Sequence, residues 1–577
     1  MENREIARIL AEIGEYLEMQ AVAFKPRAYQ KAAVAIEDLE ESVQEIYEKG
    51  GLKALEQIPG VGRSIAEKIE ELVKTGRLKY YERLKKETPV NLSELTKIEG
   101  LGPQKVKKLY ERLKIKNVSE LEKAAKAGKV RELESFGAKS EENILKGIDF
   151  LKKSGSRFVL GFAMPEIEEI KNRLKNLKEV ERVDVAGSAR RRKETIGDID
   201  ILAISKKPEK VMDFFVSMKE VINVYGQGPT RASIRLKSGL DADLRVVAEK
   251  SYGAALLYFT GSKDHNIVLR NLAIKKGLKL NEYGLFRRER QIAGRTEEEV
   301  YRALGLEYIP PEIRESAGEI ELAASKGKLP RLLGYGDLCG DLQIQTDWTD
   351  GLNSIEDYAD EAIKSGLEYI AITDHSKRLA VAHGLDEKGI LRQIKEIDRL
   401  NLRLGRSQPN FRALKGIECD ILKDGGLDID DSVLEKLDIV GVSIHSHFNL
   451  TTTEQTKRLI RAMENKNADI VFHPTARILN RREPISLDIE AVIAVAKRTG
   501  TILEIDAYPD RLDLKDEYVR KCVRAGVKLA VDSDAHSTSH LKYLEWGVGQ
   551  ARRGWAKRRD VINAWPLEKC LKFLKSA

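Results

Sequence analysis

The sequence predicts a multidomain chain of α+β and α/β class, with a helical first part, a mixed middle part and a (β/α) barrel at the end. Its 577 residues exceed what one hydrophobic core usually serves. Apolar residues recur three or four positions apart through residues 1–90, which is typical of amphipathic helices. After residue 335, short apolar runs alternate with helical segments, a pattern that favours buried parallel strands.

Composition separates the two halves and excludes some classes of protein. All four cysteines, all four tryptophans and seven of the eight histidines follow residue 338, so the halves differ in chemistry. The cysteines show no zinc-like spacing, and no run of about 18 uncharged apolar residues is present. The charged start of the chain is unlike a signal peptide. We therefore expect a reduced, cytoplasmic protein with no membrane partner, and the net charge of +8 permits nucleic-acid binding.

Two glycine turns in the helical part share one pattern. Ile58–Gly62 precedes one amphipathic helix, and Ile98–Gly102 precedes another about forty residues later. A lone Gly-x-Gly turn is most often a plain connection, but two copies in one apolar frame indicate a repeated helix-hairpin-helix motif. Such turns present backbone N–H groups to DNA phosphates without reading the base sequence. The predicted DNA contacts are Gly60, Gly62, Gly100 and Gly102.

Acidic residues at the heads of two strands organise the middle of the chain. Asp198 and Asp200 open a β-branched run, so their side chains share one face of the expected strand. Asp243 lies at the head of another strand. Neighbouring carboxylates repel each other unless a hard cation such as Mg²⁺ lies between them. Beside the turn at Gly187-Ser188, which suits a phosphate, three such acids predict a two-metal phosphoryl-transfer site.

These motifs resemble the palm of family X DNA polymerases, the polymerase beta family. Gly187-Ser188, Asp198-x-Asp200 and Asp243-Leu244-Arg245 match in type and spacing, and Tyr258–Ser262 resembles the nucleotide-pocket motif. The resemblance implies that the three acids hold Mg²⁺ (or Mn²⁺) and that Arg245 contacts DNA or steadies a catalytic carboxylate. The substrates would be dNTPs and gapped or primed DNA, and we expect a monomer. The implied dNTP contacts are Gly187, Ser188, Arg191, Gly197, Tyr258, Phe259, Gly261, Asn266 and Arg270.

The first hairpin lies where that family has a small lyase domain. The resemblance implies that Lys25, Tyr29 and Lys68 bind the 5′-phosphate of gapped DNA, with Lys68 as the Schiff-base lysine. A lysine beside other cations can have its pKa lowered enough to attack a sugar aldehyde. The alternative is that Lys68 is a phosphate contact or a solvated helix lysine.

In the last part of the chain, several predicted strands end in histidine or aspartate. His375, His445, His473 and His536 each lie at or near the end of an apolar run. Because the carboxyl ends of barrel strands meet on one face, these residues predict a metal site. The segment resembles a PHP domain, a distorted TIM-like barrel whose metal site hydrolyses phosphoesters. The implied ligands of Zn²⁺ or Mn²⁺ are Asp350, His375, Glu418, His445, His473, Asp534 and His536.

The first PHP motif departs from the family pattern. Gln343 and Gln345 stand where the family has two histidines. An amide carbonyl binds Zn²⁺ or Mn²⁺ less well than imidazole does, so we expect a weakened 3′–5′ exonuclease or phosphoesterase. Asp506 replaces a family asparagine, and its added charge is expected to compensate in part. A purely structural role for this half stays open.

The leading prediction is a gap-filling DNA polymerase of DNA repair, such as base excision repair. One alternative is a PHP phosphoesterase (3′–5′ exonuclease, 3′-phosphatase or abasic endonuclease) that uses the polymerase half as a DNA clamp. Another is a non-enzymatic DNA-binding scaffold, which the three palm acids disfavour. The expected parts are a lyase-like domain at 1–90, fingers at 91–150, a palm at 151–250, a thumb at 251–317, a linker at 318–335 and a PHP domain at 336–577.

Overall fold

The computed structural model describes residues 1, 3–37, 39, 41–98, 100–154, 157–325 and 327–574. The side chains of residues 4, 150 and 152–154 are not described. Glu99 in the second hairpin and Lys326 in the expected linker therefore lie outside the described residues. None of the helices in these ranges is long and apolar enough to span a bilayer.

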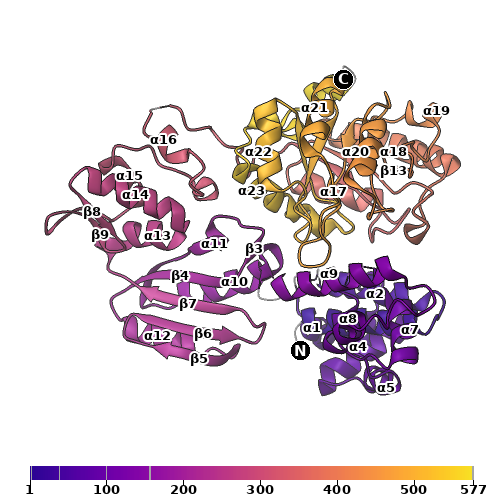
Figure 1. Cartoon of the computed structure of the whole chain (residues 1–577), viewed down its shortest axis with the longest axis horizontal. Helices are drawn as coiled ribbons and strands as arrows, with labels where there is room; N and C mark the ends of the chain where they lie inside the picture. Colours follow the sequence, from indigo (N-terminus) through magenta and orange to yellow (C-terminus); the bar gives the residue numbers. More distant parts are fainter. Residues whose placement is uncertain are drawn as a thin grey trace.

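The first part of the chain is helical, as predicted (Figure 1). Its residues form one hydrophobic cluster that runs from Ile6 to Ile148, so both hairpins share a core. The helices are α1 (Asn3–Met19), α2 (Lys25–Glu37), α3 (Val43–Leu55), α4 (Arg63–Thr75), α5 (Lys79–Glu87), α6 (Leu92–Leu95), α7 (Pro103–Leu113), α8 (Val118–Lys126) and α9 (Ala138–Ser154).

The two glycine turns adopt the same backbone geometry. Gly60 and Gly100 have φ of +74° and +78°, a conformation that costs glycine little. Gly62 and Gly102 then cap α4 and α7 from extended conformations. All four glycines are exposed, and the helix-hairpin-helix prediction is confirmed.

A five-stranded sheet follows, in the order β2-β4-β7-β6-β5. Strands β4 and β7 are parallel neighbours, whereas the other pairs are antiparallel. The strands are β2 (Val180–Val185), β4 (Asp198–Ser205), β5 (Val221–Gln227), β6 (Arg231–Leu236) and β7 (Asp241–Val246), with a small pair β1 (Phe158–Val159) and β3 (Thr195–Ile196). The helices are α10 (Leu160–Lys175), α11 (Gly187–Arg190) and α12 (Pro208–Val216).

The next segment is a small unit with its own hydrophobic cluster, which extends from Ala254 to Leu332. Its helices pack beside a three-stranded antiparallel sheet in the order β10-β9-β8. The elements are η1 (Glu249–Ser251), α13 (Tyr252–Thr260), α14 (Lys263–Lys275), β8 (Lys279–Asn281), β9 (Gly284–Arg287), β10 (Arg290–Ala293), α15 (Glu297–Ala303), η2 (Pro311–Ile313) and α16 (Glu319–Ala323).

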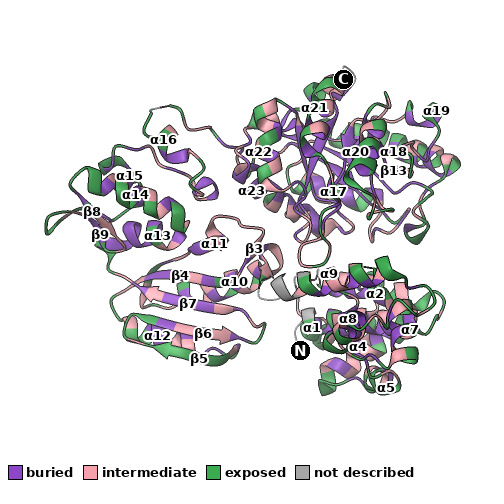
Figure 2. Cartoon of the chain, in the orientation of Figure 1, coloured by how far each residue is buried: buried purple, intermediate pink, exposed green. Residues whose placement is uncertain are grey.

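The last part is a parallel seven-stranded sheet in simple chain order. The first strand contacts the last, and a parallel bridge joins Ile344 to Ala535 just after the last strand, so the sheet is nearly closed and the predicted barrel is confirmed. The strands are buried and the surrounding helices carry the exposed residues (Figure 2), as expected for a parallel sheet covered by helices. The strands are β11 (Gly340–Ile344), β12 (Tyr369–Ile372), β13 (Arg412–Asp420), β14 (Ile439–Ser443), β15 (Ile470–Val471), β16 (Ile502–Asp506) and β17 (Leu529–Asp532).

The barrel lies beside both the helical domain and the mixed domains (Figure 1). Helix α23 lies against η2 and the turn after α11, so the barrel touches the middle of the chain directly. The helices are α17 (Ile355–Lys364), η3 (Ala380–Ala382), α18 (Glu387–Ser407), α19 (Asp431–Leu434), α20 (Thr452–Met463), α21 (Ile489–Thr499), α22 (Asp516–Ala525), η4 (Thr538–Tyr543), α23 (Leu544–Arg553), η5 (Arg558–Asp560), η6 (Ile562–Ala564) and α24 (Leu567–Leu574).

Candidate active sites

The register of β4 and β7 gathers the three predicted acids. Asp198 lies opposite Asp241, and Asp200 lies opposite Asp243, in neighbouring parallel strands. Since side chains two positions apart share a face, Asp198, Asp200 and Asp243 point to the same side of the sheet. The structure therefore brings together the groups on which the two-metal prediction depends.

Burial and the charges of neighbouring carboxylates raise the pKa values of acids in this cluster. Burial, reinforced by the charges of Asp198 and Asp243, raises the pKa of Asp200 to about 7. Burial and the charge of Asp243 also raise the pKa of Asp198. Hard oxygen donors that destabilise one another in this way fit divalent cations, so the residues present suit Mg²⁺ or Mn²⁺.

Gly187 is required by the acid cluster itself. Its φ is +64°, and a Cβ atom there would lie 2.3 Å from the Asp200 Oδ2 atom. The sequence predicts a glycine here because it lets a phosphate approach the backbone. The structure adds a steric reason, because any side chain at 187 would displace the Asp200 carboxylate.

A cavity of about 600 Å³ opens on this face of the sheet. Five predicted residues line it: Ser188, Arg191, Gly197, Asp198 and Asp243. Lys193, expected to add positive charge beside the Gly187-Ser188 turn, also lines it, whereas sequence reasoning missed Arg157, Tyr225 and Asp241. Arg157 donates to the Thr195 side chain at 2.9 Å and to its carbonyl at 2.6 Å, which fixes the guanidinium beside Asp198.

The Arg191 side chain reaches the predicted nucleotide motif. Its guanidinium donates to the Thr260 carbonyl, and a Cβ atom on Gly261 would lie 3.0 Å from it. The Asn266 amide donates to the Tyr258 carbonyl at 2.7 Å. The predicted residues 191, 258, 261 and 266 are therefore close to one another along the end of α13.

The aromatic pair and Arg270 lie at the exposed edge of this region. The Tyr258 and Phe259 rings meet edge to face at 5.1 Å, and Tyr258 is 36% exposed. Arg270 is exposed on α14. The Arg245 guanidinium lies 4.6 Å from the Phe259 ring, and Asp243 is paired with Arg231 instead, at 3.3 Å. Sequence reasoning expects Arg245 to steady a catalytic carboxylate, and its charge does favour the ionised form of Asp200; the partner of Asp243, Arg231, was not predicted.

The predicted 5′-phosphate residues gather in the helical domain. The Lys68 Nζ atom lies 6.0 Å from the Tyr29 ring and 5.0 Å from the Tyr80 ring, and it donates to the Ser64 carbonyl at 2.9 Å. Burial lowers the pKa of Lys68, and the charge of Lys25 adds to that effect. A lowered pKa favours a nucleophilic amine.

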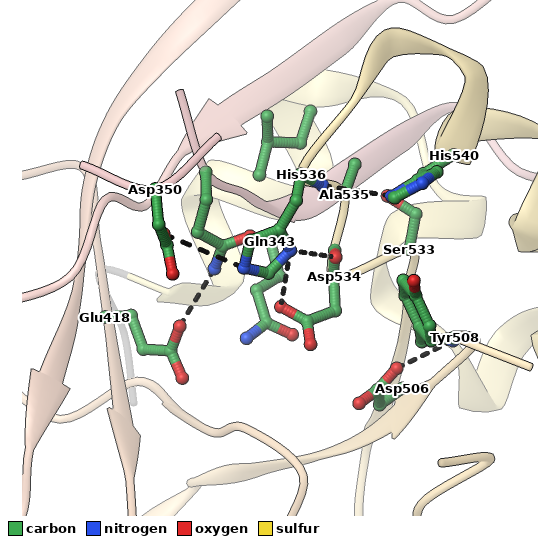
Figure 3. Close-up of polar contacts among 12 residues, drawn as sticks. Gln343, Asp350, Glu418, Asp506, Tyr508, Ser533, Asp534, Ala535, His536 and His540 are labelled. Atoms are coloured by element: carbon green, nitrogen blue, oxygen red, sulfur yellow. Dashed lines mark hydrogen bonds and ion pairs between the residues drawn. The ribbon is translucent and has the colours of Figure 1, made fainter. Parts of the chain in front are cut away.

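The seven predicted ligands of the barrel also lie close together, and Figure 3 shows four of them, namely Asp350, Glu418, Asp534 and His536. Ligand atoms of Asp350, His375 and His536 lie within 4.8 Å of one another, as do those of His375, Glu418 and His445. The His473 Nε2 atom is 2.8 Å from Glu418, and Asp534 lies beside His536. Although burial opposes it, the charges of His375 and His445 hold the pKa of Glu418 well below its ordinary value.

Several buried polar atoms in this barrel site make no hydrogen bond. They are the Asp350 Oδ1 atom, the Nδ1 atoms of His375, His445 and His473, and both amide atoms of Gln343. Buried polar groups are normally hydrogen-bonded, so Asp350 Oδ1 and the Gln343 amide, left without a partner beside the histidines, fit a site that takes a cation.

Gln343 and Gln345 lie inside this site. Figure 3 shows Gln343 among Asp350, Glu418, Asp534 and His536. Gln345 donates from its amide to Glu418 at 2.8 Å. The Nε2 group of Gln345 therefore donates a hydrogen bond to one oxygen of the Glu418 carboxylate, and that oxygen would otherwise be free to bind a cation.

Arg511 supplies a fixed positive charge that sequence reasoning missed. Its Nε atom lies 3.4 Å from both Asp506 and Asp534. Burial and the charge of Asp534 raise the pKa of Asp506 well above its ordinary value. The acid expected to compensate for the glutamines is thus paired with an arginine.

Four family profiles match this chain, over successive segments. They are a helix-hairpin-helix domain at 1–78, a SAM-like helix-hairpin-helix tandem at 92–149, a DNA polymerase beta thumb at 255–315 and a PHP domain at 341–482.

Individual relatives cover the whole chain or its barrel. The DNA polymerase/3′-5′ exonuclease PolX of Bacillus subtilis is 38% identical over 583 residues, which cover 100% of both chains. A probable phosphatase of Acetivibrio thermocellus is 32% identical over 192 residues, 32% of this chain and 73% of its own length. A probable phosphatase of Thermoanaerobacter sp. is 32% identical over 221 residues, 37% of this chain and 84% of its own length.

Proposed function

Because the chain belongs to the family X DNA polymerases that carry a C-terminal PHP domain, we propose that it is a DNA polymerase that fills short gaps during DNA repair. The observation that carries the proposal is the register that sets Asp198, Asp200 and Asp243 side by side above a cavity. A non-enzymatic scaffold would not need three carboxylates at such electrostatic cost. Base excision repair is one process in which such gaps arise.

Each residue at the cavity receives a role in this proposal. Two Mg²⁺ (or Mn²⁺) ions held by Asp198, Asp200 and Asp243 would supply the charge stabilisation and hydroxyl activation of nucleotidyl transfer. Ser188 and Arg191 bind the triphosphate of a dNTP from the turn after β2, since both line the cavity. The Tyr258-Phe259 pair contacts the sugar, while Asn266 and Arg270 contact the nascent base pair.

Single-nucleotide incorporation on gapped DNA tests this proposal. Asp198→Asn should abolish incorporation, because it removes one metal ligand while keeping the shape of the side chain. Asp213→Asn is the matched control, because Asp213 is an exposed acid on α12 of the same domain. Normal incorporation by Asp198→Asn would refute the proposed function.

A second activity is proposed for the barrel, namely 3′–5′ exonuclease or other phosphoesterase action on DNA ends with Zn²⁺ or Mn²⁺. The supporting observation is that His375 joins two groups of close ligand atoms, one with Asp350 and His536 and the other with Glu418 and His445. Gln345 and Arg511 weaken the site, since one occupies Glu418 and the other pairs with Asp534. The Gln343→His/Gln345→His double variant of the full chain should bind more metal and degrade labelled ends faster. Equal metal content in both proteins would contradict this explanation.

The helical domain is proposed to bind the DNA backbone and the 5′ end of a gap. Gly60, Gly62, Gly100 and Gly102 expose the backbone of both turns, as phosphate contacts require. Lys25 and Tyr29 lie near Lys68, for which we propose 5′-deoxyribose-phosphate lyase chemistry. We further propose a monomer that acts in the cytoplasm, where the four buried free cysteines stay reduced.

A further inference from the structure

The basic loop, Arg190–Lys193, is already paired with acids from other parts of the chain. Arg190 donates to both carboxylate oxygens of Glu297, at 2.9 and 2.6 Å. Arg192 pairs with Glu545 of α23 and lies 4.8 Å from the Trp546 ring. Arg191 and Lys193, the two cations of the loop that line the cavity, both reach Glu315.

Glu315 is shared by three cations, one of which belongs to the PHP domain. Its Oε1 atom lies 3.1 Å from Arg191 Nε, 3.4 Å from Lys193 Nζ and 3.0 Å from Arg553 Nη1. Arg553 ends α23, and its side chain is 2% exposed. It also donates to the Arg191 carbonyl at 2.9 Å and to Asp516 at 2.5 Å. These bonds hold the guanidinium in place whatever Arg191 and Lys193 do.

A triphosphate in the cavity would compete with Glu315 for the same two cations. If Arg191 and Lys193 turn toward phosphate oxygens, the half-buried Glu315 carboxylate loses two of its three partners. A buried carboxylate left without a cation is strongly unfavourable. Arg553 prevents this outcome, because it remains beside Glu315 after the exchange.

We infer, on the premise of the proposed polymerase function, that Arg553 of the PHP domain is a positioning residue of the nucleotide site. It keeps Glu315 paired, so that Arg191 and Lys193 can exchange Glu315 for the triphosphate of a dNTP. The PHP domain thus sets nucleotide affinity through α23, independently of any hydrolytic activity in its barrel. Arg553 itself touches no reacting atom.

Steady-state gap filling with the full chain separates the effects on KM and kcat. Arg553→Leu should raise the KM for dNTP about tenfold with kcat within about twofold, because Glu315 then retains Arg191 and Lys193. Glu315→Gln alone should lower KM, and the double variant should return KM toward the wild-type value. Calorimetric titration of dNTP into each protein gives the same order of affinities without turnover.

Arg552→Leu is the matched control. Arg552 precedes Arg553 in α23 and crosses the same interface to Glu312 at 2.7 Å, but it does not contact Glu315. Its loss should leave KM unchanged.

An unchanged KM in Arg553→Leu, or an equal rise in Arg552→Leu, would overturn the inference. Glu315→Gln tests it separately if Arg553→Leu does not fold, since an unchanged KM there also overturns it. A wild-type chain that incorporates no nucleotide would instead remove the proposed function, and the titrations would still decide the role of Arg553.

Discussion

Gly187→Ala should lower both the stability of the palm and its activity. Two effects contribute, namely the backbone conformation at residue 187 and the overlap of a new Cβ atom with Asp200. An alanine at φ +64° costs about 1–2 kcal/mol in backbone conformation. The new Cβ atom would lie 2.3 Å from Asp200 Oδ2, an overlap that adds about 1–3 kcal/mol unless the carboxylate moves. Movement of Asp200 by about 1 Å would lower incorporation about a hundredfold.

Gly239→Ala is the control that isolates the second effect. Gly239 lies in the turn between β6 and β7 with φ +87°, but its Cβ atom would meet Phe158 at an ordinary 3.7 Å. It should therefore show the backbone cost alone and keep full activity.

Thermal denaturation and single-nucleotide incorporation measure the two variants. About 1 kcal/mol corresponds to about 4–8 °C in Tm for a domain of about 100 residues such as the palm. Gly187→Ala should therefore have a Tm several degrees below that of Gly239→Ala, together with a large loss of rate. Equal Tm values, or a Gly187→Ala protein with normal incorporation, would refute the claim that Asp200 requires a glycine beside it.

Three further predictions concern charge. Burial raises the pKa of Asp200 from 3.8 to about 7, so the folded chain holds a proton that the unfolded chain loses. In the presence of a chelator, this carboxyl should lower stability progressively as pH rises from about 4 to 7, and Asp200→Asn should reduce that slope in thermal melts. Arg190→Met should destabilise the chain by about 3 kcal/mol in denaturant unfolding, because Glu297 is buried and its pKa is held at about 2 by Arg314 and Arg190. Lys68→Ala should abolish borohydride trapping of abasic gapped DNA, whereas Lys68→Arg should retain DNA binding without trapping; trapping by either variant would exclude Lys68 as the nucleophile.

Local patterns allowed the fold class and the principal acids to be predicted. The β-branched and apolar residues that follow Asp198 predict a strand over 198–204, and β4 spans Asp198–Ser205. The two hairpins were recognised because they repeat. The histidines at 375, 445, 473 and 536 are predicted to meet because each lies at or near the end of an apolar run, and the structure brings them close together.

Residues that act through long-range packing were not predicted. Arg231 reaches Asp243 from β6 only because of the antiparallel register, which a single strand does not encode. Arg511 lies in the loop between β16 and α22, and the path of this loop into the barrel depends on the whole sheet. The contact of Arg553 with Glu315 joins residues 238 positions apart. Residue type alone does not reveal which of many arginines meets which acid.

The shared core of the two hairpins has a mechanical consequence. Because one hydrophobic core runs from Ile6 to Ile148, the exposed glycine turns at 60–62 and 100–102 belong to a single packed unit. If both turns bind the sugar–phosphate backbone as proposed, the two points of contact would keep a constant separation. DNA whose backbone geometry matches that separation would contact both turns at once, and other DNA would contact only one.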